Sequence, residues 1–353
     1  MDDALTRYSC QVALPGFGKN AQALLKKAKV LVVGAGGLGC PALQYLTSSG
    51  IGTIGVADHD VVSVSNLHRQ ILYNPYDIGL KKALIAAGRL QKQNPEIGVV
   101  PHDVKITAEN VMEIIGGYDL VVDGTDNFET RYLLNDAAVL SGKPLVYGAI
   151  YQYEGQAAVW NTRNSDGTFS PNYRDLYPEV NAAQIPNCAE GGVIPTLAGI
   201  IGSIMANEVI KYITGTGELL SGKVLVFDAQ TLQSRIIKIG LVTKTHIEKL
   251  PLYEQAPLIS ASELKKGLAE NRFDLVDVRT LQERDLFDIG GKHIPAEEIE
   301  ENLEYLGNER PKVLYCATGK RSSEAVKLVK QKNPDAEVFS LDGGLEEWLD
   351  FNG

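Results

Sequence analysis

The chain has 353 residues, of which 44% are hydrophobic and 22% charged, a globular composition with enough length for about two domains. Its formal net charge is −10. Because nucleic acids and anionic membranes are also negatively charged, we expect neither as a partner. The sequence has neither a signal-peptide pattern nor an apolar run long enough to span a bilayer, which predicts a cytoplasmic protein.

Strand-like apolar runs alternate with helical patterns from Lys29 to Ile150, which predicts a mostly parallel sheet with helices on both faces. The stretch 162–186 is polar, rich in Pro and Asn and without periodicity, which predicts a long mobile loop. Alternation in "GKVLVFDAQ" and "QSRIIKIG" then predicts antiparallel edge strands. A second, smaller α/β pattern follows. We therefore predict an α/β fold with a Rossmann-like domain over 1–245, a linker over 246–257 and a small domain over 258–353.

The stretch "KVLVVGAGGLGCPALQYLTSSGIGTIGVADHD" predicts a nucleotide site in the first domain. A strand runs into Gly34, Gly36 and Gly39, a helix follows, and a second strand ends at Asp58. Such glycines bring backbone N–H groups and a helix N-terminus against phosphates, and an acid at this distance can hold ribose hydroxyls. The pattern fits ADP-like ligands in general, so a nicotinamide-dependent dehydrogenase is still an alternative at this point.

Polar side chains further along the chain favour a triphosphate over a hydride carrier. They are Asn66, Arg69, Gln70 and Lys82 after the second strand, and Asp126 after the strand "DLVVD". Several cationic and amide groups near a phosphate loop suit a nucleotide whose pyrophosphate must leave. A carboxylate at the carboxyl end of a parallel strand can hold Mg²⁺ beside them. No set of residues suits hydride transfer, so we set the dehydrogenase aside.

The chain resembles the E1-type enzymes of the MoeB, ThiF and HesA group, which activate small ubiquitin-like sulfur carriers. The resemblance is carried by "RYSCQVALPGFG", "VGAGGLGCPALQYL", "DHDVVSVSNLHRQIL", "GTDNFETR" and "NCAEGGVIPTLAGIIGSIMANEVIKYI". It implies a homodimer that adenylates the C-terminal Gly-Gly carboxylate of a carrier with MgATP. By motif, Gly36 and Gly39 would cradle phosphates, Asp58 would bind ribose, Asn66, Arg69, Gln70 and Lys82 would contact the triphosphate, and Asp126 would hold the metal.

The sequence departs from the family pattern at three places, one of which is the C-terminal motif H-I-P-G-A, which reads His293-Ile-Pro295-Ala-Glu. Cys10 stands where the family has an arginine that reaches the partner's ATP, and because a thiol cannot replace a guanidinium, we expect slower adenylation. Many relatives bind structural zinc through two C-x-x-C pairs, but the first pair's positions hold Asn172 and Asp175, and no cysteine follows "QSRIIKIG". We therefore predict no zinc. The alternatives to a sulfur-carrier adenylyltransferase are an adenylating enzyme that modifies a peptide or an amino acid, and a catalytically weakened binding module.

The strand "KVLYC" ends in a short loop from Cys316 to Arg321, and a helix follows at once. Backbone N–H groups around Gly319, the helix N-terminus, Lys320 and Arg321 favour a thiolate and then a persulfide anion on Cys316. With "DVRTLQERDLF" upstream and "LDGGLEEW" downstream, the region resembles a rhodanese sulfurtransferase domain. A cysteine phosphatase is the competitor, but its loop has one more residue between cysteine and arginine.

The two halves together predict an adenylyltransferase joined to a sulfurtransferase. The carrier's terminal glycine would be activated as an acyl-adenylate, and a Cys316 persulfide would supply sulfur to give a thiocarboxylate. Cys188, just before "AEGGV", fits the E1 cysteine that forms a thioester or an acyl disulfide, but a dispensable cysteine is equally compatible. The implied partners are a small carrier ending in Gly-Gly and a persulfide donor such as a cysteine desulfurase. The sequence leaves the pathway open between thiamine, molybdopterin and another sulfur-containing product.

Overall fold

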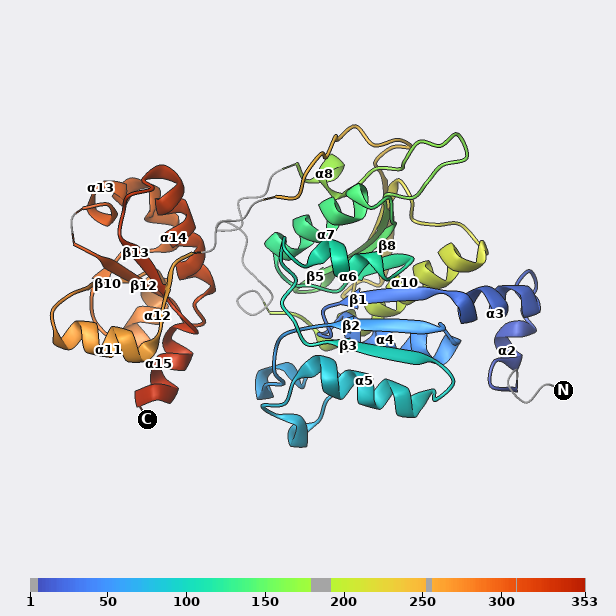
Figure 1. The fold of residues 1–353 in the computed structure, drawn as a ribbon, viewed down its shortest axis with the longest axis horizontal. Helices are drawn as coiled ribbons and strands as arrows, with labels where there is room; N and C mark the ends of the chain where they lie inside the picture. Colours follow the sequence, from blue (N-terminus) through green and yellow to red (C-terminus); the bar gives the residue numbers. More distant parts are fainter. Residues whose placement is uncertain (1–5, 179–191, 252–255, 309, 353) are drawn as a thin grey trace. The chain divides into compact units, whose positions relative to one another are not determined.

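The computed structural model describes residues 6–178, 192–251, 256–308 and 310–352. The described residues up to 251 form one compact unit and those from 256 form another, each built around a sheet of its own (Figure 1). Within these ranges, no helix combines the length and the apolar character that a membrane crossing needs.

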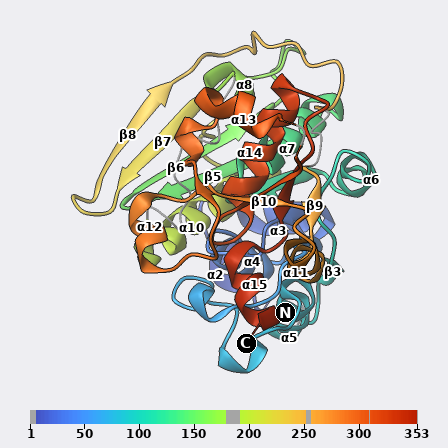
Figure 2. The same cartoon turned by 90° about the vertical axis from the view of Figure 1, so that its left-hand side faces the viewer.

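The first unit contains an eight-stranded sheet with the order β3-β2-β1-β4-β5-β6-β7-β8. Its parallel strands are β1 (Lys29–Val33), β2 (Thr53–Ala57), β3 (Gly98–His102), β4 (Leu120–Asp123) and β5 (Leu145–Tyr151). The antiparallel strands β6 (Glu154–Trp160), β7 (Lys223–Asp228) and β8 (Gln233–Lys238) extend one edge, as Figure 2 shows. The predicted mostly parallel sheet with antiparallel edge strands is confirmed, and β6 is a strand that the sequence analysis did not identify.

Helices cover both faces of this sheet because the strand order reverses between β1 and β4. α4 (Gly39–Ser49) and α5 (Lys82–Gln93) connect strands in one direction along the sheet, and α7 (Phe128–Leu140) connects β4 to β5 in the other. Right-handed crossovers therefore put α7 on the face opposite α4 and α5. α6 (Val111–Gly116) packs with α7, and α10 (Pro195–Thr214) packs with α4 and with α3 (Gly18–Lys27) (Figure 1).

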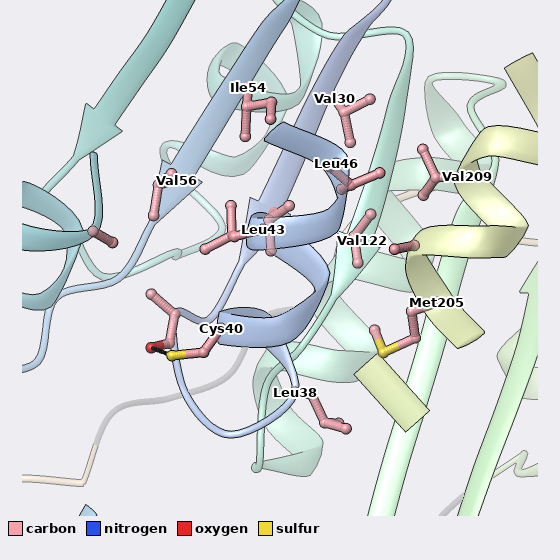
Figure 3. Close-up of a cluster of buried hydrophobic side chains, with 14 of the residues drawn as sticks. Val30, Leu38, Cys40, Leu43, Leu46, Ile54, Val56, Val122, Met205 and Val209 are labelled. Carbon is pink, nitrogen blue, oxygen red and sulfur yellow. Dashed lines mark hydrogen bonds between the residues drawn. The ribbon is translucent and has the colours of Figure 1, made fainter. Parts of the chain in front are cut away.

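The main core lies between the sheet, α4 and α10 (Figure 3). Leu43 and Leu46 of α4, Val30 of β1 and Met205 of α10 are all fully buried there. Burying a side chain of this size stabilises the fold by about 1.5–3 kcal/mol. This packing fixes the N-terminus of α4, which follows directly on the glycine loop, against the central strands.

The second unit contains a five-stranded parallel sheet with the order β11-β10-β12-β13-β9. The strands are β9 (Leu258–Ile259), β10 (Asp274–Asp277), β11 (Lys292–His293), β12 (Lys312–Tyr315) and β13 (Val338–Leu341). The helices are α11 (Ala261–Ala269), α12 (Leu281–Leu286), α13 (Leu303–Leu306), α14 (Lys320–Lys332) and α15 (Gly344–Asn352). Alternate residues of β10, β12 and β13 contribute to two cores, one with Val326 of α14 and one with Leu264 of α11. The predicted small α/β domain is confirmed.

The prediction of a mobile loop over 162–186 is wrong for the part up to residue 178. This part contains the helix α8 (Tyr173–Leu176), and Tyr173 is only 1% exposed. The Tyr173 ring packs against the rings of Tyr132, Tyr147 and Trp160, at centroid distances of 5.2, 5.4 and 6.5 Å. These contacts come from other elements, so local polarity and missing periodicity could not reveal them. Residues 179–186 lie outside the described ranges.

Candidate functional site

The carboxyl ends of β1 and β4 carry two turns that lie against each other. Gly34 follows β1 with a φ of +89°, and a Cβ there would lie 2.7 Å from the carbonyl oxygen of Gly124, which follows β4. A Cβ at Gly39 would clash with the carbonyl oxygen of Gly34. Two of the predicted glycines are therefore required by the tight turn and by the close approach of the two loops.

The segment after Asp58 folds back onto the glycine loop. A Cβ at Gly36 would lie 3.6 Å from Gln70 Nε2, and a Cβ at Gly37 would lie 3.4 Å from Cδ of Arg69. Gln70 is 4% exposed, and its Oε1 has no hydrogen-bond partner among the described residues. An orphaned acceptor next to the loop is unusual in a folded protein and is a position where a ligand group or a water can donate. Asn66 is half-buried in the same segment.

A buried lysine lies beside this loop. Asp58 accepts hydrogen bonds from the backbone N–H of Ala35 at 2.8 Å and of Asp60 at 2.9 Å. Burial raises the pKa of the Asp58 carboxyl above its usual value, and the nearby Lys82 ammonium partly offsets this rise. Lys82 is 4% exposed, and its Nζ donates to Asp60 Oδ2 at 3.0 Å. Since Asp60 is exposed, a phosphate can take its place as the partner of Lys82.

A buried ion pair supports the turn that carries Asp126. Asp123 is fully buried and accepts from Arg131 Nε at 3.3 Å. The Arg131 guanidinium also donates to the carbonyl oxygen of Thr125 at 2.9 Å and lies 4.9 Å from the centroid of the Tyr147 ring. Arg131 thus holds the backbone directly before Asp126, whose side chain is exposed. The predicted triphosphate and metal residues accordingly lie around one edge of the sheet.

Asn172 and Asp175, the positions that the sequence analysis compared with the first zinc-binding pair, make hydrogen bonds to a distant segment. Asp175 accepts from Thr243 Oγ1 at 2.6 Å and from Thr245 Oγ1 at 2.9 Å, and Asn172 Nδ2 donates to Thr243 Oγ1 at 2.9 Å. Burial raises the pKa of the Asp175 carboxyl, but these hydrogen bonds outweigh burial and hold it below its usual value. The absence of zinc stays a prediction. Within the described ranges, Asp58, His59 and Asp60 form the one group of three or more histidine, cysteine or acidic side chains whose ligand atoms lie close enough together to hold a metal ion.

The loop after β12 encloses Cys316, which is 1% exposed. Ser322 Oγ donates to Cys316 Sγ at 3.7 Å, a contact that the sequence analysis missed. Gly319 has a φ of +81°, and a Cβ on Gly344 would clash with the Gly319 nitrogen and lie 2.5 Å from the carbonyl oxygen of Cys316. The N–H of Leu345 donates to that same carbonyl oxygen at 2.9 Å. The turn before α15 therefore closes directly onto the cysteine loop.

The two predicted cations of this loop have different surroundings. Lys320 is the exposed first residue of α14. Arg321 donates to both carboxylate oxygens of Glu283, at 2.8 and 2.6 Å. This pairing lowers the pKa of Glu283 from its usual 4.5 to about 2. A role of Lys320 and Arg321 toward the Cys316 sulfur stays a prediction.

The remaining cysteines differ in their environments. Cys10 is exposed on α2 (Ser9–Val12). Cys40 is buried in α4, its Sγ donates to the carbonyl oxygen of Ala35 at 3.3 Å, and burial raises the pKa of this thiol to about 12. Cys188 lies outside the described residues. Cys40 is thus a packing residue, and Cys316 differs from it because its sulfur accepts from a hydroxyl, that of Ser322.

Two family models match this chain. The model of the ThiF family matches residues 8–246, and that of the rhodanese-like domain matches residues 260–351. The chain therefore belongs to the ThiF family and carries a rhodanese-like domain after it. Among its relatives, the probable adenylyltransferase/sulfurtransferase MoeZ of Mycobacterium tuberculosis is 43% identical over 366 residues, covering 98% of this chain and 93% of the relative. The adenylyltransferase and sulfurtransferase MOCS3 of Xenopus laevis is 35% identical and covers 98% and 86%.

Other relatives match the first unit alone. The sulfur carrier protein adenylyltransferase of Thermus thermophilus is 51% identical over 228 residues, covering 64% of this chain and 84% of the relative. Among solved structures, MccB of E. coli has a TM-score of 0.61 at 20% identity and covers 72% of this chain and 75% of that one. MccB has also been solved with ATP. At this identity, the likeness to MccB shows the fold. The relatives confirm the predicted class, an adenylyltransferase joined to a sulfurtransferase, and do not favour the alternatives.

Proposed function

We propose that this chain adenylates the C-terminal carboxylate of a small sulfur-carrier protein and then supplies sulfur to it from Cys316. The observation that carries the proposal is the presence of two sites on one chain, a glycine loop beside buried Lys82 and a cysteine loop that starts a helix. Relatives that match 98% of the chain have both activities in their names. The MccB likeness, which would favour a peptide substrate, covers only part of the chain at low identity.

The first site fits ATP. We assign the backbone around Gly36 and Gly39 to the phosphates, because the glycine loop leads directly into the N-terminus of α4. The orphaned Oε1 of Gln70 can accept from a ligand donor. We assign ribose binding to Asp58 and triphosphate contacts to Asn66, Arg69, Gln70 and Lys82. Asp126 is the carboxylate that we assign to Mg²⁺, which when bound would neutralise charge on the phosphate oxygens.

The main requirement of the adenylation step is positive charge that stabilises the departing pyrophosphate, and the step needs no general acid or base. A carboxylate oxygen of the carrier bonds to the α-phosphorus of ATP while the bond to the bridging oxygen breaks, and pyrophosphate leaves with the electron pair. Lys82 and Arg69 stabilise the charge that develops on the departing group. Arg131 keeps the turn before Asp126 in place through the carbonyl oxygen of Thr125.

Sulfur transfer then follows in two steps. The outer sulfur of a Cys316 persulfide attacks the carbonyl carbon of the acyl-adenylate, AMP leaves, and an acyl disulfide forms on Cys316. A thiolate next attacks Cys316 Sγ, the sulfur–sulfur bond breaks, and the carrier leaves as a thiocarboxylate. We assign this thiolate to Cys188 or to a small thiol. A further thiol reduces the resulting disulfide and returns Cys316 as a thiolate.

The proposal implies particular partners. The carrier is a small ubiquitin-like protein that ends in Gly-Gly, and the sulfur comes from a persulfide donor of the cysteine desulfurase class. A relative from Porphyra purpurea is named a probable molybdopterin-synthase adenylyltransferase, which favours molybdopterin over thiamine biosynthesis. We propose a cytoplasmic homodimer with Cys10 near the partner's ATP, and slower adenylation than in relatives with arginine there.

Exchange of pyrophosphate into ATP tests the adenylation half. We expect exchange that depends on a Gly-Gly carrier, that Asp126→Ala abolishes, and that Asp166→Ala, an exposed acid of the same unit, leaves unchanged. Cys10→Arg should raise the rate. If no carrier supports exchange and Cys10→Arg does not restore it, the adenylation half is wrong.

Intact mass of the carrier tests the sulfur half. After a persulfide donor is added, we expect one carboxylate oxygen of the carrier to be replaced by sulfur. Cys316→Ala should abolish this mass change and leave pyrophosphate exchange at its full rate. Exchange without any sulfur gain in the wild-type chain would restrict the function to adenylation.

A further inference from the structure

Three serine side chains form a hydrogen-bonded chain that ends at the Cys316 sulfur. Ser322 Oγ lies 3.7 Å from Cys316 Sγ, Ser340 Oγ lies 2.8 Å from Ser322 Oγ, and Ser323 Oγ donates to Ser340 Oγ at 3.2 Å. Ser322 and Ser340 are both fully buried. Burying a hydroxyl is costly unless it keeps a hydrogen-bond partner, and here the partners are one another, the sulfur and the carbonyl oxygen of Gly319.

The fold brings these serines together from two elements. Ser322 and Ser323 lie in the first turn of α14, directly after the cysteine loop. Ser340 lies on β13 on the same face as Val338, which belongs to the apolar core against α14. An apolar residue would suit the Ser340 position in this core. The Ser340 hydroxyl instead makes a hydrogen bond to Ser322, and Ser322 in turn contacts the Cys316 sulfur.

The direction of the hydrogen bonds depends on the charge of the sulfur. Each hydroxyl has a single proton to donate. When Cys316 is anionic, Ser323 donates to Ser340, Ser340 to Ser322, and Ser322 to the sulfur. When Cys316 carries a proton, the carbonyl oxygen of Gly319 offers an alternative acceptor, at 3.1 Å from Ser322 Oγ and 3.4 Å from Ser340 Oγ.

Two arginines near the cysteine loop are paired with carboxylates, so neutral hydrogen-bond donors can contribute to stabilising an anionic sulfur. Arg321, the loop arginine, makes its bidentate hydrogen bonds to Glu283, and Asp277 pairs with Arg279 at 2.6 Å. The elements packed around Cys316 carry ionisable groups of both signs: Asp274, Asp277 and Arg279 on and after β10, Glu283, Arg284 and Asp285 on α12, Lys312 on β12, Lys320, Arg321, Glu324, Lys327, Lys330 and Lys332 on α14, and Asp342, Glu346, Glu347 and Asp350 from the end of β13 to α15. Since Arg279, Arg321 and Lys327 pair with carboxylates, a neutral donor in direct contact with the sulfur can contribute to stabilising an anion there.

We propose that Ser322 is a catalytic residue that stabilises Cys316 as a leaving thiolate, and that Ser340 is a positioning residue that orients Ser322. The inference rests on the proposed persulfide role of Cys316. Whenever a bond between Sγ and a second sulfur breaks and the electron pair returns to Sγ, negative charge develops there. The hydrogen bond from Ser322 strengthens as that charge develops, which lowers the barrier.

A discharge experiment on the full chain tests this without carrier or ATP. Thiosulfate loads the thiolate of Cys316, with sulfite as the leaving group, and the persulfide is verified on the tryptic peptide 313–320. Cyanide then bonds to the outer sulfur, thiocyanate forms, and Cys316 Sγ takes the electron pair. A hydrogen bond to a charged group is strong, so we expect Ser322→Ala to slow discharge roughly tenfold or more.

Further variants separate the role of Ser340 from a merely structural one. We expect Ser340→Ala to slow discharge roughly threefold, a partial loss because the Ser322 hydroxyl itself remains. The double variant should be no slower than Ser322→Ala, since Ser340 acts through Ser322. Ser322→Thr, which keeps a hydroxyl, should retain most of the rate. Ser262→Ala removes an exposed hydroxyl of the same unit and should leave the rate unchanged.

The outcomes distinguish this inference from the proposed function. If wild-type Cys316 does not load with persulfide, the proposed sulfur role is wrong, and the inference falls with it. If Ser322→Ala loads fully and discharges at the wild-type rate, the inference is wrong and the proposed function stands. A double variant slowed by the product of the single effects would show that Ser340 does not act through Ser322.

Discussion

The nucleotide site and the cysteine loop are both turns at the carboxyl end of a parallel strand, yet their polar groups are arranged differently. In the first unit, Lys82 pairs with an exposed carboxylate, and Gln70 Oε1 has no partner among the described residues. In the second, Arg321 makes a bidentate pair with Glu283, and the hydroxyl of Ser322 donates to the Cys316 sulfur.

This difference fits the ligands that we propose for the two sites. A site for a large, charged ligand keeps groups whose partners can be exchanged, because the ligand completes their hydrogen bonds. A site for a covalently bound sulfur has its donors in place before the reaction, because the reacting atom belongs to the protein. The first site is therefore sensitive to loss of charge, and the second to loss of backbone geometry.

The largest expected effect tests the sensitivity of the first site to charge. Lys82→Ala removes the buried ammonium beside the phosphate loop, and we expect carrier-dependent pyrophosphate exchange to fall roughly 100- to 1,000-fold. Lys92→Ala, at an exposed lysine of the same helix, should leave exchange unchanged. A Lys82→Ala variant with a near wild-type rate would break the comparison, because the charge would then serve only the ion pair with Asp60.

The next effect tests the sensitivity of the second site to geometry. Gly344→Ala places a Cβ against the cysteine loop, so we expect sulfur transfer to fall at least roughly tenfold with adenylation intact. Gly290→Ala is the matched control, because Gly290 also has a positive φ, +90°, but no atom of the described residues lies within 4 Å of a Cβ added there. Both substitutions cost backbone strain, so equal losses of transfer would show that strain alone is responsible.

The smallest effect concerns the pairing of Glu283 with Arg321. Since the pKa of Glu283 is lowered from 4.5 to about 2, the pair contributes stability above pH 4.5, which is lost as the pH falls toward 2. Glu283 is about a third exposed, so we expect only about 1 kcal/mol of stability to be at stake. In a Trp160→Phe background, fluorescence of Trp348 reports unfolding of the second unit alone. Between pH 7 and pH 4, Glu283→Gln should lose less stability than the parent chain; equal losses would contradict the assignment.

The parts of the fold and site that the sequence predicts are the local ones. A strand, a glycine turn and a helix follow one another within a few residues, so both loops and the parallel sheet could be predicted from order alone. The missed features join residues far apart in the sequence. Ser340 meets Ser322 across 18 residues, Glu283 meets Arg321 across 38, and Asp175 meets Thr243 across 68.

Two physical reasons explain these misses. Serine, aspartate and glutamate are ordinary surface residues, so their types carry no signal of a buried partner. Their pairing is decided by which helix packs on which face, and this follows from the assembled sheet. The loop up to residue 178 was mispredicted for the same reason, since Tyr173 is buried by Tyr132, Tyr147 and Trp160 from other elements.

The central place of β1 has a consequence for how the chain folds during its synthesis. β1 pairs on one side with β2, which is made soon afterwards, but on the other side Val30 pairs with Leu120 of β4. By contrast, β5 with β6 and β7 with β8 are hairpins that close locally. Distant contacts form slowly, because closing a long loop costs entropy. Until β4 emerges from the ribosome, the backbone N–H and C=O groups along one edge of β1 have no partner strand, and its side chains are mostly apolar. Both properties make β1 an aggregation-prone segment of the nascent chain.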